Sequence, residues 1–299
     1  MSNASREIEI TRIVDAPAEM VFDAFTRPEH LEKWWGPEGF TVSAVESDPR
    51  PGGVFALVMT GPDGVNYPMR GVFREVDRPD RLVTEESAVD DGGRPLVSAV
   101  TTITFAEHDG KTELTLRATG TALTAEAVQM LDGMELGWVQ SLRHLEDFVE
   151  GKLDRQIVLS RFLEAPRERV FEAWTTQEHV ERWFGPRGFT LTVDEMDVRP
   201  GGTWRFTMHG PDGVDYPNEI VYAEVSPPEA LVYVHGSTDP DDPAFRVTAT
   251  FDEFMGNTIL TMRMVFATAG DRDLVVDKYG AIEGGNETLH RLSEFLVAP

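Results

Sequence analysis

Residues 183–213 read WFGPRGFTLTVDEMDVRPGGTWRFTMHGPDG, and residues 34–64 read WWGPEGFTVSAVESDPRPGGVFALVMTGPDG. The two stretches lie 149 positions apart, and an ungapped alignment of residues 12–83 with 161–232 has 37 identities in 72 positions. Such extensive identity at one fixed spacing is typical of a tandem duplication. The chain therefore contains two copies of one domain, and a fold assigned to one copy applies to the other.

The length of 299 residues gives each copy about 150 residues, which is enough to bury a core without metals or disulfides. We expect one domain over residues 5–150 and a second over 154–299. The chain has no cysteine, which excludes thiolate metal sites, thiol nucleophiles and disulfides.

The formal net charge is −25, from 27 Lys and Arg against 52 Asp and Glu. Residues 1–150 carry 13 basic and 27 acidic side chains, and residues 151–299 carry 14 and 25, so both copies would repel a phosphate backbone. We therefore expect no nucleic-acid partner. No apolar run is long enough for membrane insertion, and no secretory signal is recognisable, so a cytoplasmic location is expected.

Each copy is predicted to follow the same order of elements. Residues 6–14 alternate as a strand does, and a proline at 17 suits the first turn of a short helix. A second short helix follows Pro28. From about 39 to 120, alternating segments separated by Gly-rich turns predict an antiparallel meander with one buried face.

A long amphipathic helix is predicted to close each copy, because apolar side chains recur there at intervals of three or four. The first stripe is Leu131, Met134, Trp138, Leu142, Leu145 and Phe148, and the second is Val275, Tyr279, Ile282, Leu289, Leu292 and Phe295. Glycines interrupt both helices, either for close packing on the sheet or to leave a hollow. With Leu142 aligned on Leu289, Trp138 stands opposite Gly285, so the second copy is expected to be the emptier one unless Tyr279, Met262 and Phe266 fill the space.

An arginine stands on the apolar side of the first strand in both copies, at Arg12 and at Arg161. One interpretation is a buried ion pair with a carboxylate, since charges are rarely buried unpaired. The partners considered are Glu75 or Glu46 in the first copy and Glu224 or Glu195 in the second. The other interpretation is a polar anchor inside a ligand cavity.

Catalytic motifs are scarce. The sequence has no HExxH and no GxSxG, and His30 and His179 lack a second histidine at metal-ligand spacing, so both are expected to pack structurally. The acidic pairs Glu85-Glu86 and Asp241-Asp242 are expected on solvated faces. No metal and no cofactor is predicted.

Several motifs together are similar to one known family. APAEMVFDAFTRPEHLEKWWGP, DPRPGG and GPDG in the first copy, with APRERVFEAWTTQEHVERWFGP, DVRPGG and GPDG in the second, resemble the bacterial homologues of the activator of heat-shock-protein-90 ATPase. These belong to the START-like (SRPBCC) superfamily. The resemblance implies an α+β fold of two tandem helix-grip domains, each a curved antiparallel sheet wrapped around a long terminal helix.

The leading functional hypothesis is non-catalytic binding of a small hydrophobic or amphipathic molecule between sheet and helix; the alternative for the same side chains is an ordinary packed core. Two further hypotheses are a chaperone-accessory protein acting through surface contacts, and a cyclase or hydrolase using Arg12 with Glu75 or Arg161 with Glu224. The predicted ligand-binding residues are Arg12, Trp35, Phe55, Met59, Tyr67, Phe73, Glu75, Trp138, Arg161, Phe184, Trp204, Met208, Tyr216, Tyr222, Glu224 and Met262.

Overall fold

A computed structural model describes residues 4–62, 64–90, 92–237 and 242–297. Asp63, Asp91 and Asp241, which belong to predicted turns and acidic pairs, lie outside these ranges. The chain divides into two compact units, Met1–Lys152 and Leu153–Pro299, called domain one and domain two below. None of the helices in the described ranges is both long enough and apolar enough to cross a membrane.

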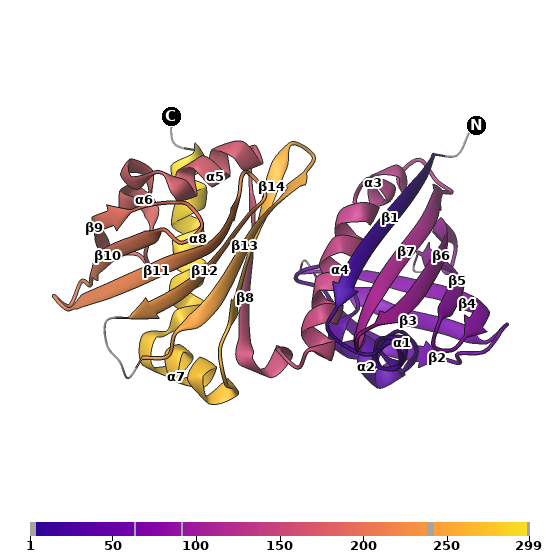
Figure 1. Cartoon of the computed structure of the whole chain (residues 1–299). Helices are drawn as coiled ribbons and strands as arrows, with labels where there is room; N and C mark the ends of the chain where they lie inside the picture. Colours follow the sequence, from indigo (N-terminus) through magenta and orange to yellow (C-terminus); the bar gives the residue numbers. More distant parts are fainter. Residues whose placement is uncertain (1–3, 63, 91, 238–241, 298–299) are drawn as a thin grey trace. The chain divides into compact units, whose positions relative to one another are not determined.

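Domain one begins with a strand, continues with two short helices and six more strands, and ends in two helices (Figure 1). Its elements are β1 (Ser5–Val14), α1 (Ala18–Thr26), α2 (Pro28–Trp34), β2 (Thr41–Ser47), β3 (Val54–Thr60), β4 (Asn66–Asp77), β5 (Arg81–Val89), β6 (Pro95–His108), β7 (Lys111–Ala122), α3 (Val128–Asp132) and α4 (Met134–Val149).

Domain two repeats this order after a short 3₁₀ turn, η1 (Leu153–Arg155). Its elements are β8 (Gln156–Leu163), α5 (Arg167–Thr175), α6 (Gln177–Trp183), β9 (Thr190–Met196), β10 (Thr203–His209), β11 (Asp215–Ser226), β12 (Ala230–Ser237), β13 (Phe245–Phe254), β14 (Asn257–Val265), α7 (Ala269–Tyr279) and α8 (Ala281–Val297).

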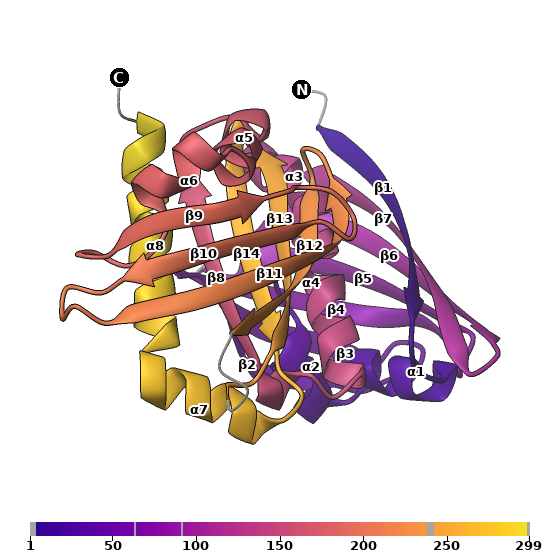
Figure 2. The same ribbon diagram turned by 60° about the vertical axis from the view of Figure 1, so that its left-hand side comes forward.

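Each domain has one seven-stranded sheet in which every neighbouring pair is antiparallel. The strand order is β1-β7-β6-β5-β4-β3-β2 in domain one and β8-β14-β13-β12-β11-β10-β9 in domain two. Six strands thus form a meander, and the first strand pairs with the last one. Helix α8 runs across one face of the second sheet, behind β9 to β11 in Figure 2. The predicted α+β fold of two helix-grip domains is confirmed.

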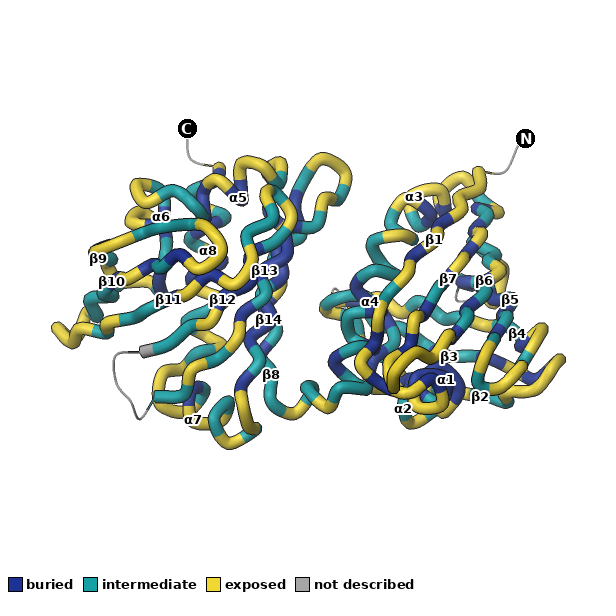
Figure 3. Tube along the Cα trace, viewed as in Figure 1, coloured by how far each residue is buried: buried dark blue, intermediate teal, exposed yellow. Residues whose placement is uncertain are grey.

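Residues alternate between a buried inner face and a wetter outer face on the inner strands of each sheet, as in β7, where every second residue is buried (Figure 3). This pattern is expected for an antiparallel sheet covered on one side. The two short helices are fixed to each other by a tryptophan in both domains. Nε1 of Trp34 donates to the carbonyl of Ala24 at 2.9 Å, and Nε1 of Trp183 donates to that of Ala173 at 3.0 Å.

A long terminal helix closes each domain as predicted, α4 and α8, but the predicted apolar stripe begins on a separate preceding helix in both domains. Helix α7 ends at Gly280, which adopts a left-handed conformation with φ of 60° that glycine tolerates best. Beyond this break the chain changes direction. Tyr279 and Ile282, which were predicted to lie on the buried stripe, are 41% and 43% exposed. In domain one the corresponding break is at Gly133.

Candidate functional site

The inner face of the sheet in domain one carries a chain of aromatic contacts. Trp35 packs against Phe55 with ring centres 5.3 Å apart and against Trp138 of α4 at 5.2 Å. Phe55 also packs edge-on against Phe73 at 5.8 Å. Phe55 and Phe73 are fully buried, whereas Trp35 and Trp138 are half-buried. These four predicted residues therefore lie together in one cluster. The cluster is fully buried on the sheet and more exposed at Trp35 and Trp138 beside the helix.

Met59 and Tyr67 face each other across β3 and β4, and both are half-buried. Tyr67 packs against Phe40 with ring centres 5.8 Å apart. On the helix side, a Cβ added at Gly137 would meet nothing within 4 Å. Free space thus borders α4 next to Trp138.

The corresponding residues of domain two also form an aromatic cluster. Phe184 packs against Trp204 with ring centres 5.0 Å apart, and Tyr222 packs edge-on against Tyr233 at 5.9 Å. Met262 on β14 is half-buried against the same core. The residues brought together here carry more polar groups than their counterparts in domain one.

Met208 and Tyr216 occupy the positions of Met59 and Tyr67, and they too face each other across neighbouring strands. Tyr216 packs against Phe189 at 5.9 Å, and its ring centre lies 6.5 Å from that of Tyr279 on α7. Helix α7 therefore approaches this end of the inner face in domain two.

On the inner face of domain two, two buried aromatic donors have no hydrogen-bond partner among the described residues. They are Nε1 of Trp204 and the hydroxyl of Tyr222, and the two residues are 0% and 1% exposed. Burial raises the pKa of the Tyr222 hydroxyl, which therefore stays protonated. In domain one the same positions hold Phe55 and Phe73, which have no polar atom to satisfy. Leaving such a group unpaired costs about 1–3 kcal/mol.

The predicted pairing of Arg12 with Glu75 or Glu46 is wrong. Nε of Arg12 lies 3.8 Å from Oε1 of Glu146 on α4. Glu75 instead pairs with Arg81 at 3.1 Å, and its side chain is 50% exposed. The register shift in β4 between Phe73 and Glu75 accounts for this, since it turns Glu75 away from the inner face.

The pairing predicted for Arg161 is also wrong. Glu195 forms its ion pair with Arg205, and Glu224 is exposed and accepts a hydrogen bond from the hydroxyl of Ser226 at 2.7 Å. Among the described residues, no carboxylate pairs with Arg161. The difference from domain one lies on the terminal helix, where Ser293 takes the place of Glu146.

Three pairs of equivalent contacts, from the terminal helix to the second short helix and the loop after it, establish that Ser293 corresponds to Glu146. Phe148 packs on His30 and Phe295 on His179, with ring centres 5.1 Å and 5.4 Å apart. In the second pair, the ring of His144 hydrogen-bonds to the carbonyl of Gly36 in domain one. In domain two, Arg291 donates a hydrogen bond to the carbonyl of Gly185. The third joins Glu38 to Gln140 and Arg187 to Glu287. The packing role predicted for the two histidines is confirmed.

Glu86 is a buried acid that the sequence analysis assigned to a solvated face, and that assignment is wrong. The residue is 4% exposed, and its Oε1 accepts a hydrogen bond from the hydroxyl of Thr101 at 2.6 Å. Oε2 has no partner among the described residues. Burial raises the pKa of this carboxyl, which favours its neutral form. The alternation of Leu82, Thr84 and Glu86 was the signal that placed it inside.

His235 occupies the position of Glu86 in domain two, 149 residues further along the chain. Its Nε2 lies 2.9 Å from Oδ1 of Asn218, and because that oxygen only accepts, Nε2 is the protonated nitrogen. Burial lowers the pKa of the imidazole to about 4, so the ring is neutral at pH 7. The two interiors thus differ at their central polar position.

The expectation of a hollow at Gly285 is wrong. A Cβ at this glycine would overlap Cδ1 of Leu159, so the position serves close packing of α8 on β8. Gly137 in domain one, and not Gly285 in domain two, borders free space.

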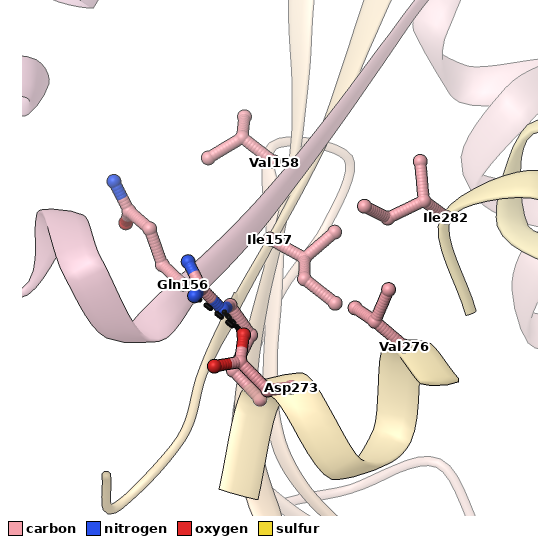
Figure 4. A pocket seen from close by; sticks show the side chains of 7 residues that line it. Gln156, Ile157, Val158, Asp273, Val276 and Ile282 are labelled. Atoms are coloured by element: carbon pink, nitrogen blue, oxygen red, sulfur yellow. Dashed lines mark hydrogen bonds and ion pairs between the residues drawn. The ribbon is translucent and has the colours of Figure 1, made fainter. Parts of the chain in front are cut away.

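An open cleft of about 270 Å³ lies at the start of β8, beside the corner between α7 and α8 (Figure 4). Its apolar wall comes from Ile157, Val276 and Ile282, and the Arg272–Asp273 ion pair lies at its edge. None of the predicted ligand-binding residues lines it. The cleft lies where α7 and α8 meet on either side of Gly280, and the glycines noted in the sequence did not indicate a cleft at this place.

Within the described residues, no group of three His, Asp or Glu side chains comes together as a metal site. What the inner faces offer is aromatic surface and a few buried hydrogen-bonding groups. This arrangement defines a START-like helix-grip protein with polar groups on its inner faces.

The chain belongs to the family of Activator of Hsp90 ATPase homolog 1-like proteins, whose model matches residues 15–150 and 164–297. A crystal structure of a protein from Chromobacterium violaceum is 31% identical, with a TM-score of 0.43 over 48% of this chain and 96% of that one. A Mycobacterium smegmatis protein is 30% identical, with a TM-score of 0.40 over 48% and 88%. The di-domain ARO/CYC protein BexL is 17% identical, with a TM-score of 0.39 over 98% and 99%. No curated protein matches the chain.

Proposed function

We propose that each domain binds a small hydrophobic or amphipathic molecule between the inner face of its sheet and its terminal helix, without catalysing a reaction on it. The observation that carries this proposal is the set of buried polar atoms without partners on the inner faces. They are Oε2 of Glu86 in domain one, and Nε1 of Trp204 and the hydroxyl of Tyr222 in domain two. A bound molecule with complementary polar atoms would remove the cost of leaving these groups unpaired.

The surrounding side chains support the same proposal. Half-buried aromatic and sulfur-containing residues, such as Trp138 and Met59 in domain one, provide adaptable apolar contacts at the more open end of the inner face. Free space at Gly137 lies on the same helix. The ligand would therefore enter at this end and reach towards the buried polar groups.

Titration of the full chain with N-phenyl-1-naphthylamine, a neutral fluorescent probe, tests this function. We expect a saturable rise in probe fluorescence. We also expect Gly137→Leu, which fills the space beside α4, to weaken the binding in domain one. An exposed glycine of a turn, changed by Gly110→Asn, provides the control. A folded chain that shows no saturable binding at micromolar concentration contradicts the proposal.

Membership of the family favours a second candidate function, a chaperone-accessory role through surface contacts. This candidate does not need an open interior. Stimulation of the ATPase rate of a purified chaperone of the heat-shock-protein-90 class would support it. An unchanged rate at saturating protein would exclude it for that chaperone.

A further inference from the structure

Arg12 and Arg161 are the same residue at the same place in the two repeats, but their surroundings differ. Both side chains project from the inner face of the first strand and are half-buried. Glu146 neutralises Arg12, whereas Ser293 stands at the corresponding position of α8 in domain two. Domain two thus keeps the cation and lacks the anion.

The guanidinium of Arg161 has no counter-charge among the described residues, and none of its nitrogens is both buried and unpaired, so it stays accessible to water and to an incoming anion. Its planar set of donors matches a carboxylate in particular, through two parallel hydrogen bonds. No carboxylate of the described residues fills this role for Arg161. The unpaired guanidinium of Arg161 therefore suits an anionic group brought by another molecule.

Two further residues of domain two also offer unpaired hydrogen-bond donors on the inner face. Trp204 and Tyr222 lie on neighbouring strands and are diagonal neighbours on the inner face, because Trp204 pairs with Ile220. Both present unpartnered donors, where domain one has Phe55 and Phe73. The interior of domain two therefore favours oxygen acceptors at more than one point.

We propose that domain two, and not domain one, binds an amphipathic molecule that carries a carboxylate, with Arg161 pairing with the carboxylate. This inference rests on the proposed function and specifies its ligand class for one of the two interiors. The net charge of the chain does not oppose it strongly, since exposed charges are screened beyond about 8 Å at physiological salt.

Calorimetric titration of the full chain with 2-naphthoate and with neutral 2-naphthamide tests the inference, because these probes share their apolar body. We expect naphthoate to bind at least about tenfold more tightly, as a charge-assisted hydrogen bond predicts. Arg161→Gln should reduce this preference to within about twofold, and Arg161→Lys should retain part of it. Arg169→Gln removes an exposed arginine of domain two and should change neither affinity.

The duplication provides two reciprocal variants. Ser293→Glu places in domain two the carboxylate that neutralises Arg12, and it should remove the preference for naphthoate. Glu146→Ser frees Arg12 and should add a naphthoate site in domain one. Thermal unfolding of each variant verifies that it is folded.

The possible failures are distinguishable. Equal affinity for the two probes, or a preference that survives Arg161→Gln, overturns the anionic ligand class while leaving the proposed function intact. If neither probe binds to the folded parent chain, both proposals fail.

Discussion

Nε of Arg12 on β1 lies 3.8 Å from Oε1 of Glu146 on α4, and this pair links the sheet of domain one to its terminal helix. In domain two the contact between α8 and β8 is apolar instead, since Leu159 occupies the space next to Gly285. The two repeats therefore share one fold but join sheet to helix by different chemistry. These differences allow each copy to serve as a control for the other.

Removing one buried hydroxyl should stabilise the ligand-free chain. Tyr222→Phe deletes a hydroxyl that has no partner, so we expect the free energy of unfolding of domain two to rise by about 1 kcal/mol. Phe73→Tyr places the same hydroxyl in domain one and should lower stability there by a similar amount. Calorimetric unfolding of both variants without ligand measures this. A loss of stability in Tyr222→Phe would show that the hydroxyl has a partner.

Adding one methyl group to the terminal helix should have opposite effects in the two domains. Gly285→Ala would overlap Leu159, and we expect it to destabilise domain two by about 1–3 kcal/mol. Gly137→Ala meets nothing within 4 Å and should stabilise domain one by up to about 1 kcal/mol, since alanine favours a helix. Denaturant unfolding of the two variants tests this. Equal effects of the same sign would disprove the assigned difference in packing.

The buried acid of domain one should make its stability depend on pH. Burial raises the folded-state pKa of Glu86 above its ordinary value of 4.5. The contribution of Glu86 to the free energy of unfolding is therefore fully present below pH 4.5, and it is lost as pH rises towards the folded-state pKa. Glu86→Gln removes this loss, so its stability relative to the parent chain should increase with pH from about 4.5 upwards.

Unfolding curves across this pH range measure the effect of Glu86. Glu85→Gln is the control, since Glu85 is a partly exposed neighbour that pairs with Arg74. A pH-independent difference between Glu86→Gln and the parent chain would mean that the acid does not change its charge there.

The half-buried histidine of domain two, His235, should make stability depend on pH in the opposite direction. Burial lowers the pKa of His235 from 6.5 to about 4, so its contribution to stability is present above pH 6.5 and is lost as pH falls towards 4. The total loss is on the order of 3 kcal/mol. His235→Gln should reduce this dependence, and NMR titration of the ring measures the pKa directly. A midpoint near 6.5 would contradict the burial effect.

Much of the fold could be predicted from the sequence, because local patterns determine it. The alternation in β10, with Trp204 and Phe206 on one side, identified the inner face. The spacing of Leu142 and Leu145 identified the face of α4 that is buried. A repeat with 37 identities in 72 positions then extended each assignment to the second domain.

The rest could not be predicted, because it depends on contacts between distant segments. The partner of Arg12 lies 134 residues away on a helix, and its identity depends on how that helix lies on the sheet. Glu86 was assigned to the surface because acids usually are exposed, although its place in the alternation indicated the opposite. The left-handed Gly280 separates α7 from α8, and glycine alone does not specify such a break.

A crystal structure of the full chain grown with 2-naphthoate would test ligand binding in the interior most directly. We predict electron density for the naphthalene between α8 and the inner face of the second sheet, with its carboxylate in contact with the guanidinium of Arg161. Density only on the outer surface, or an interior unchanged and without ligand at saturating concentration, would contradict it.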